Sequence, residues 1–293
     1  MKQPSHFVSD WLDKRAKLTP SAVALIDYAS GTETTYREWN ERANQTANYL
    51  RSLGIGKGDR VAVYAMNRPE YLDLFWAAPK IGAVLQNLNW RLTVHELKGI
   101  VETGAPKALV YSEDWTEQVE ELRLSFSTVE HVVAMGAPGP GDRHISERDS
   151  MPVSLDDTSE LELDDPWGIY YTGGTTGLPK GAVLTHGNVT WNSVNTITSW
   201  GISCRHKAAL QLPFFHIGGP NIFMAPLVHA GGTTILCTGF DPDETYDLLE
   251  TSGITHYVGV PTMFQLLQEH PRWDDADFSK LELVISGGAP CPI

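Results

Sequence analysis

Residues 35–64, TYREWNERANQTANYLRSLGIGKGDRVAVY, contain the pattern that decides the fold. Thr35 and Glu38 have the spacing of a capping box, in which a hydroxyl and a carboxylate satisfy free backbone donors at the start of a helix. Apolar residues then recur at helical spacing, at Trp39, Ala43, Ala47 and Leu50. The glycine-rich stretch 54–59 ends this helix, and residues 61–64 are typical of a buried strand. The sequence therefore predicts a helix followed by a buried strand.

The same alternation continues along the chain. Further helices are expected over 70–80, where Pro79 weakens the pattern locally, after a second capping box at 93–96, and after the Asp cap and proline at 241–242. Further strands are expected at 83–88, 108–111, 168–171, 208–212, 233–237, 255–260 and 283–286. Strands separated by helices pair in parallel, so the predicted fold class is α/β, with doubly wound, mostly parallel sheets and flanking helices.

One stretch interrupts the alternation. Residues 136–165 are rich in Gly, Pro, Ser and acidic residues, which predicts a surface loop or connector. Any subdivision of the chain would fall there.

Composition narrows the function classes. The 293 residues carry a formal net charge of −14, so nucleic acid and anionic membrane surfaces are not expected as partners. The sequence has no signal peptide at its start and no apolar stretch long enough to span a bilayer. Cys204, Cys237 and Cys291 have no paired spacing, which predicts reduced and mostly buried thiols. These features together predict a cytoplasmic protein without a membrane span.

The chemistry is expected in residues 169–181, IYYTGGTTGLPKG, where an apolar strand runs into a loop of small residues. Glycines allow several backbone N–H groups to converge on phosphate oxygens, threonines add hydroxyl donors, and the lysine adds a mobile positive charge. The P-loop and dinucleotide fingerprints do not match, because Lys180 is followed by Gly181 and Leu178-Pro179 separates it from Gly177. A plain surface loop is the alternative to a phosphate-binding loop.

Residues 171–180 resemble the phosphate-loop signature of the adenylate-forming superfamily, which includes acyl-CoA synthetases, luciferases and the adenylation domains of peptide synthetases. Four further segments match this superfamily in order. Residues 87–93 resemble the Asn-x-Arg-Leu-[Ser/Thr] segment, 184–188 the sequence after the phosphate loop, 213–216 the Pro-x-x-His acyl-site motif, and 286–290 the Gly-Gly-Ala-Pro adenine-site motif. The resemblance covers nearly the whole chain.

The resemblance implies a reaction and a set of site residues. A small-molecule carboxylic acid would react with ATP and Mg²⁺ to give an acyl-adenylate, which coenzyme A would then attack. The implied phosphate-binding residues are Thr172, Gly173, Gly174, Thr175, Thr176, Gly177 and Lys180. The implied adenine-binding residues are Gly287, Gly288, Ala289 and Pro290. Lys180 and His216 would be catalytic, and His216, Gly218 and Gly219 would shape the acyl pocket beside the thiol tunnel.

Each of these residues has a plainer interpretation. His216 could be a hydrogen-bonded core histidine, and each glycine pair could be a simple turn. His186, His206 and His229 lack metal-ligand spacing, and no metal site built from protein side chains is expected.

The resemblance also sets the expected extent of the site. The sequence ends at Ile293, before the superfamily's Tyr-Gly-x-Thr-Glu motif, its ribose-binding Asp, its hinge and its C-terminal lid. We therefore expect residues 1–293 to be a truncated N-terminal ATP- and acyl-binding domain that is inactive alone. A carboxylate–CoA ligase is the first interpretation. A carrier-protein-loading adenylation domain, a luciferase-like oxygenase and a non-catalytic binding module are the alternatives. Fatty, aryl and sterol-derived acids stay open, as does a homodimer.

Overall fold

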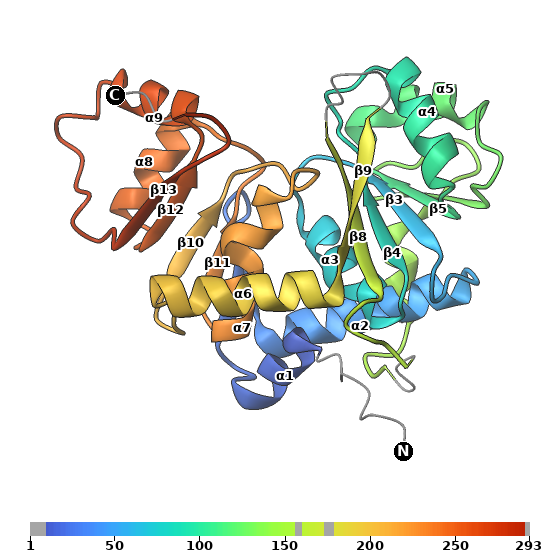
Figure 1. The fold of residues 1–293 in the computed structure, drawn as a ribbon, viewed down its shortest axis with the longest axis horizontal. Helices are drawn as coiled ribbons and strands as arrows, with labels where there is room; N and C mark the ends of the chain where they lie inside the picture. Colours follow the sequence, from blue (N-terminus) through green and yellow to red (C-terminus); the bar gives the residue numbers. More distant parts are fainter. Residues whose placement is uncertain (1–9, 156–159, 173–178, 291–293) are drawn as a thin grey trace.

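The computed structural model describes residues 10–155, 160–172 and 179–290. Within them the chain forms two twisted sheets with helices on their faces, as Figure 1 shows. The first sheet has the order β13 (Leu283–Ser286), β12 (His256–Gly259), β10 (Lys207–Leu210), β11 (Thr233–Leu236), β1 (Val23–Asp27), β2 (Glu33–Thr35). The second has the order β7 (Arg143–His144), β6 (His131–Ala134), β5 (Ala108–Tyr111), β3 (Arg60–Tyr64), β4 (Val84–Asn87), β8 (Pro166–Thr172), β9 (Lys180–Thr185).

Pairing is parallel throughout both sheets except at β1–β2 and β8–β9. The predicted α/β fold with mostly parallel sheets is therefore confirmed. In the first sheet β1 lies between β2 and β11, and Leu25 is in register with Thr234.

Helices cover both faces of each sheet, as a doubly wound fold requires. On one face of the second sheet, α4 (Val94–Gly104) and α5 (Thr116–Arg123) pack against Ala62 and Tyr64 of β3. On its other face, α2 (Tyr36–Ser52) and α3 (Pro69–Lys80) pack against Val61 and Val63. The alternation of side chains along β3 thus supplies two cores at once.

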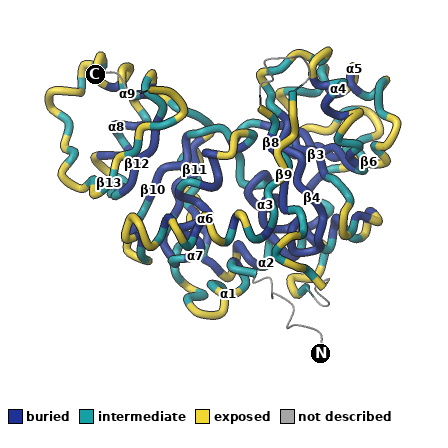
Figure 2. The backbone as a smooth tube through the Cα atoms, in the orientation of Figure 1, coloured by how far each residue is buried: buried dark blue, intermediate teal, exposed yellow. Residues whose placement is uncertain are grey.

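The helices α2 and α3 also serve the first sheet. Their core cluster includes Leu25, Leu210 and Leu236 together with α7 (Ala225–Ala230), so one apolar layer lies between the two sheets. The outer face of the first sheet is covered by α8 (Pro242–Glu250) and α9 (Pro261–Gln268). The other α-helices in the described ranges are α1 (Trp11–Leu18) and α6 (His186–Trp200). Figure 2 shows the buried backbone concentrated along the central strands and α3.

Local sequence signals place the helix starts correctly. Thr35 Oγ1 accepts from the Glu38 N–H at 3.3 Å while Glu38 Oε2 accepts from the Thr35 N–H at 2.8 Å. The second capping box forms the same way at Thr93 and Glu96, and Asp241 caps α8. All four apolar residues singled out in α2 are buried.

Two expectations need correction. The segment 136–165 is not a bare surface loop, because it forms β7 and the 3-10 helix η2 (Ile145–Ser150). Arg148 of η2 is buried, and its Nη1 lies 2.8 Å from Asp73 Oδ2, which also binds Arg42 Nε at 2.8 Å. Cys204 is exposed rather than buried, whereas Cys237 is buried and Cys291 lies outside the described residues. In the described part of the chain, no helix is long and apolar enough to cross a membrane.

Candidate active site

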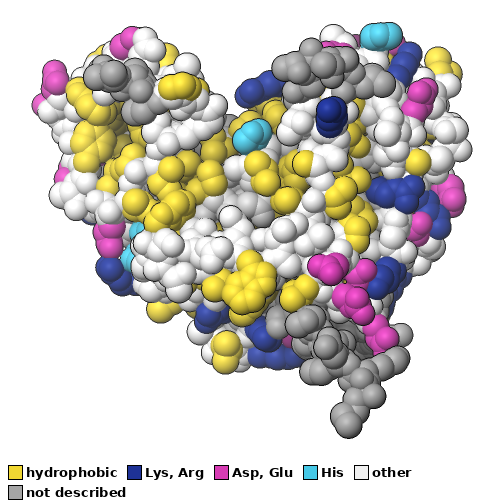
Figure 3. Space-filling view, viewed as in Figure 1, with side chains coloured by type: hydrophobic (Ala, Val, Ile, Leu, Met, Phe, Trp, Pro, Cys, Tyr) yellow, Lys and Arg dark blue, Asp and Glu magenta, His cyan; other side chains and the backbone are white. Residues whose placement is uncertain are grey.

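The sequence motifs gather at the carboxyl ends of the parallel strands. Residues 211–219, here called the β10 loop, follow β10, and residues 287–290, the β13 loop, follow β13. Residues 88–93, the β4 loop, follow β4 in the other sheet, where Thr172 ends the neighbouring β8. Ligands of open α/β sheets bind at this edge. Figure 3 shows the molecular surface hollowed there, between the end that carries α8 and α9 and the end that carries β8 and α4.

The β10 loop is a tight turn held by its own backbone. The His216 N–H donates to Pro213 O at 3.1 Å, and the Gly219 N–H donates to His216 O at 2.9 Å. The chain then enters the π-helical turn η3 (Pro220–Met224), in which the Asn221 side chain donates to Ile217 O at 3.1 Å. The loop backbone is therefore fixed on both sides of His216.

His216 is exposed, so its interpretation as a core histidine is wrong. Its Nδ1 accepts a hydrogen bond from the Gly218 N–H at 3.1 Å. A backbone N–H can only donate, so in the neutral ring the proton must be on Nε2. His216 thus presents an Nε2–H donor on its other side.

The two glycines of the β10 loop differ in their surroundings. A Cβ on Gly219 would lie 2.4 Å from Pro213 O and 3.0 Å from Pro213 C, which is backbone and cannot move aside. A Cβ on Gly218 would lie 3.2 Å from His216 Nδ1 and 3.3 Å from Ile222 Cδ1, both of them side-chain atoms. Gly219 is therefore explained by packing of the turn itself, whereas Gly218 lies against the candidate catalytic ring.

The β4 loop touches the β10 loop through aromatic rings. Trp90 meets Phe215 edge to face with centroids 5.9 Å apart, and the Arg91 guanidinium lies 4.8 Å from the Trp90 ring and 5.8 Å from the Phe215 ring. Arg91 is exposed and has no ion-pair partner among residues 10–155, 160–172 and 179–290. Arg91 belongs to the motif at 87–93, but no role was predicted for it; the structure shows its guanidinium held against two aromatic rings.

The candidate phosphate loop connects the two strands of a hairpin. Thr172 and Lys180 face each other at the ends of β8 and β9, and Thr172 Oγ1 lies 3.5 Å from Lys180 O. Gly173, Gly174, Thr175, Thr176 and Gly177 lie outside the described residues. Lys180 is exposed at the start of β9.

The strand that carries this loop contacts the β10 loop region. Asn221 Nδ2 lies 3.4 Å from the Tyr170 hydroxyl, and both residues are buried. Burial of that phenol raises its pKa far above 10, so it stays protonated. Tyr170 precedes Thr172 by two positions and Asn221 follows Gly219 by two, so the end of β8 lies beside the turn that follows the β10 loop.

The β13 loop has fewer backbone hydrogen bonds than the β10 loop among the described residues. Its only backbone hydrogen bond to the neighbouring strand in the described residues joins the Gly287 N–H to Gly259 O at 3.2 Å. Gly288 has φ +80°, a conformation that favours glycine, and Gly288, Ala289 and Pro290 are exposed. A Cβ on Gly287 would meet no atom within 4 Å.

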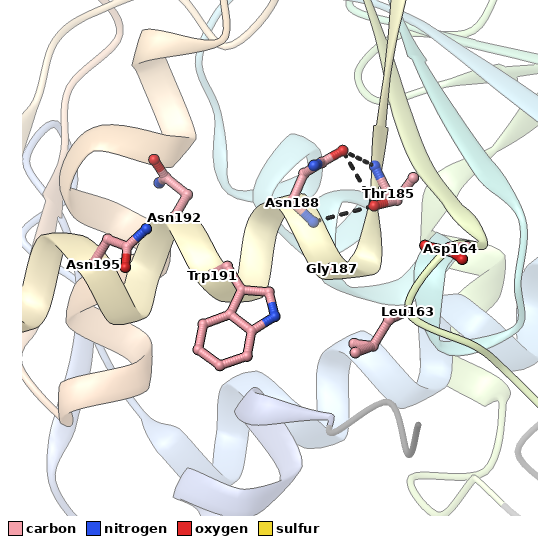
Figure 4. A pocket seen from close by; sticks show the side chains of 8 residues that line it. All are labelled: Leu163, Asp164, Thr185, Gly187, Asn188, Trp191, Asn192 and Asn195. Atoms are coloured by element: carbon pink, nitrogen blue, oxygen red, sulfur yellow. Dashed lines mark hydrogen bonds between the residues drawn. The ribbon is translucent and has the colours of Figure 1, made fainter. Parts of the chain in front are cut away.

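The matched segment 184–188 has a structural role. Thr185 caps α6, because its Oγ1 accepts from the Asn188 N–H at 3.1 Å and Asn188 Oδ1 accepts from the Thr185 N–H at 2.9 Å. Figure 4 shows these residues beside a shallow depression on the outer side of α6, which Trp191 and Leu163 also line. This depression is not at the carboxyl edge of the sheets.

The three histidines that lack metal-ligand spacing, His186, His206 and His229, are all buried. Burial lowers the pKa of His186 to about 4 and that of His229 to about 3, so both rings are neutral near pH 7. No group of three His, Cys, Asp or Glu residues is placed to hold a metal ion within the described ranges.

Comparison with known proteins agrees with this arrangement. Feruloyl-CoA synthase of an Amycolatopsis species is 36% identical over 97% of this chain and 55% of that protein. Indoleacetate–CoA ligase of Aromatoleum aromaticum is 32% identical over 97% of this chain and 56% of that protein. The chain therefore spans about half the length of the curated relatives it matches.

The solved structures give the same result. The inhibitor-bound N-terminal domain of FACL13 from Mycobacterium tuberculosis is 29% identical with a TM-score of 0.89, over 96% of this chain and 70% of that one. ATP-bound MatB from Rhodopseudomonas palustris is 28% identical with a TM-score of 0.82, and the match covers 95% of this chain and 55% of that one. The sequence model of the AMP-binding enzymes matches residues 12–293. The chain belongs to the AMP-binding enzyme family.

Proposed function

We propose that the protein joins a carboxylic acid to coenzyme A through an acyl-adenylate. The observation that carries this proposal is the contact between Tyr170, on the strand that leads into the phosphate loop, and Asn221, in the helical turn that directly follows the acyl-site motif and the β10 loop. Both segments lie at the edge where α/β sheets bind ligands. In this proposal residues 1–293 act as an N-terminal ATP- and acyl-binding domain of the active protein.

The proposed reaction has two displacements. A carboxylate oxygen attacks the α-phosphorus of ATP, the bond to the pyrophosphate oxygen breaks, and the acyl-adenylate remains. The CoA sulfur then attacks the acyl carbon and loses its proton, and AMP leaves. Both displacements need two reactants held in contact while negative charge is neutralised.

The residues at the sheet edge divide these tasks. The ammonium group of Lys180 and the hydroxyl of Thr172 stand at the two ends of the glycine-rich loop and would bind the β- and γ-phosphates. Mg²⁺ would be bound together with the triphosphate oxygens, as is usual for this ion. Mg²⁺ would supply positive charge to the phosphate oxygens. The Nε2–H of His216 would donate to the substrate carboxylate and so fix its direction of attack.

The β13 loop is the proposed adenine contact. Nothing in the described chain requires Gly287 to lack a side chain, because a Cβ there would meet open space. Close approach of a ligand to the backbone is a common reason for such a glycine. A planar base lying against residues 287–290 would provide that reason.

The names of the relatives suggest where to begin with the acid. Two of the similar proteins are named for aryl acids, feruloyl-CoA synthase and indoleacetate–CoA ligase, and a third is named as a long-chain-fatty-acid–CoA ligase. Phe215 directly precedes His216 in the sequence, and its ring meets that of Trp90 edge to face. We therefore propose an aryl-substituted carboxylic acid as the substrate class to test first.

The test is acid-dependent ATP–pyrophosphate exchange by the full-length protein with aryl, fatty and sterol-derived acids, followed by mass spectrometry of the thioester formed with CoA. Exchange with at least one acid and a CoA thioester are expected. Loss of one charge-assisted contact should make Lys180→Ala weaken ATP use by about 1.5–3 kcal/mol, with a smaller effect on the acid. Transfer only to a carrier protein would replace the proposed acceptor, and no exchange with any acid would contradict the proposal.

A further inference from the structure

Asn67 occupies a junction that the proposed chemistry leaves unexplained. It lies between β3 and α3, and only 4% of it is exposed. Its Nδ2 donates to Leu212 O at 3.0 Å and to Cys237 O at 3.2 Å, and its Oδ1 accepts from the Phe214 N–H at 3.0 Å. One buried amide thus joins the carboxyl ends of β3, β10 and β11, which belong to two different sheets.

We propose that Asn67 is a positioning residue that sets the orientation of His216, an inference that rests on the role proposed above for His216. The two bonds from Asn67 to Leu212 and Phe214 fix the chain on either side of Pro213. Pro213 O in turn accepts the His216 N–H. The amide therefore acts on the histidine through a single intervening residue.

Tyr71 of α3 holds the β10 loop from a second direction. The Phe214 ring meets the Tyr71 ring at 80° with centroids 5.3 Å apart, and the Tyr71 hydroxyl donates to Asn87 Oδ1 at 2.8 Å. Tyr71 lies four positions after Asn67, at the start of α3. The β10 loop is thus docked on the second sheet by one amide and one ring.

The chemistry of the junction requires asparagine. The site needs two N–H donors and one acceptor on a short side chain. Aspartate keeps the acceptor but places a second oxygen against two carbonyls, and alanine leaves three buried backbone groups without partners. Loosening the loop would free the Gly218 N–H from His216 Nδ1, and both ring tautomers would then be populated.

The first experiment measures the tautomer directly, without catalysis. Long-range proton–nitrogen NMR of the full-length protein labelled with ¹⁵N-histidine, with His216→Gln for assignment, should give His216 the Nε2–H form in wild type. In Asn67→Ala the two ring nitrogens should shift toward each other, as in a tautomer mixture. An unchanged His216 spectrum in folded Asn67→Ala would overturn the inference, whether or not the protein ligates acids.

The second experiment is kinetic. Because small misplacements of a catalytic group cost up to about a hundredfold in rate, Asn67→Ala should lower kcat for exchange by roughly ten- to a hundredfold. The KM for ATP should change less than threefold, because the phosphate loop is on another strand. In Asn67→Asp the activity relative to wild type should rise as pH falls, because a protonated carboxyl again donates to one carbonyl.

The matched control is Asn44→Ala. Asn44 is also buried, on α2, and its Nδ2 donates to Val153 O at 2.9 Å; among the described residues it has no hydrogen bond to the β10 loop. It should lower thermal stability as Asn67→Ala does while leaving the His216 tautomer and kcat unchanged. Equal loss of kcat in both variants would show a general structural effect and reject the positioning role. If the wild-type protein were inactive but Asn67→Ala still showed the expected tautomer change, the proposed function would be contradicted and the positioning role of Asn67 would not.

Discussion

The two Gly-Gly pairs at the carboxyl edge of the first sheet have the same sequence. The physical reason why glycine occupies each position nevertheless differs between them. In the β10 loop, Gly219 is buried with φ −56°, and space alone excludes a side chain, because the carbonyl of Pro213 occupies the position of a Cβ. In the β13 loop, Gly288 is exposed with φ +80°, so backbone conformation is the constraint. Gly287 meets neither constraint within the protein. A Gly-Gly dipeptide therefore marks packing, conformation or ligand approach, and only the structure separates them.

The largest effect should come from Gly219→Ala. A methyl group 2.4 Å from Pro213 O forces the backbone apart, and overpacking of this kind costs about 3 kcal/mol. Urea unfolding of the full-length protein would measure the loss, and acid-dependent exchange should fall with it. An unfolding free energy within 0.5 kcal/mol of wild type would show that the turn can open without cost.

A smaller loss is expected from Gly288→Ala. Non-glycine residues in the left-handed region cost about 1–2 kcal/mol, although an exposed strand end can relax by changing φ. We therefore expect about 1 kcal/mol in the same unfolding assay. A loss as large as that of Gly219→Ala would mean that the β13 loop is packed as tightly as the β10 loop.

Gly218→Ala separates space from function within one loop. Its methyl group would press on His216 Nδ1 and Ile222 Cδ1, which are side-chain atoms that can shift by a few tenths of an ångström. Stability should fall by less than about 1 kcal/mol. The KM for the acid should rise because the His216 ring is displaced. An acid KM equal to that of wild type would place His216 away from the carboxylate.

Gly287→Ala should be the mildest change for folding and the most selective for ligand. With open space around the added methyl group, the unfolding free energy should stay within about 0.5 kcal/mol of wild type. The KM for ATP should nevertheless rise several-fold, while the KM for the acid changes little. If calorimetry showed that Gly287→Ala binds ATP as tightly as wild type, the proposed adenine contact at this loop would be wrong.

Much of the fold was predictable because its signals are local. Capping boxes at Thr35 and Thr93 involve residues three positions apart, and the strands at the centre of the second sheet are continuous apolar runs. The strand β9 was missed because it lies at a sheet edge and four of its six residues are exposed, so no apolar run marks it. The phosphate-loop sequence was recognised, but its hairpin geometry was not.

The rest depends on pairs that are distant in sequence. Arg148, within the connector, binds Asp73 of α3, and no local pattern at 136–165 indicates this buried ion pair. The importance of Asn67 is equally invisible, because an asparagine before Arg68-Pro69 suggests only a turn. His216 was found through its motif, whereas its tautomer required the position of the Gly218 N–H.

The parallel pairing of β1 with β11 in the first sheet has a consequence for synthesis in the cell. Leu25 can pair with Thr234 only after the ribosome has made β11, and at about 5–20 residues per second this takes about 10–40 s. Most of the second sheet, whose strands lie between Arg60 and Thr185, emerges earlier and can fold first. Until then the strand Val23–Asp27 lacks its parallel neighbour, and we expect chaperones to bind the nascent chain during that interval.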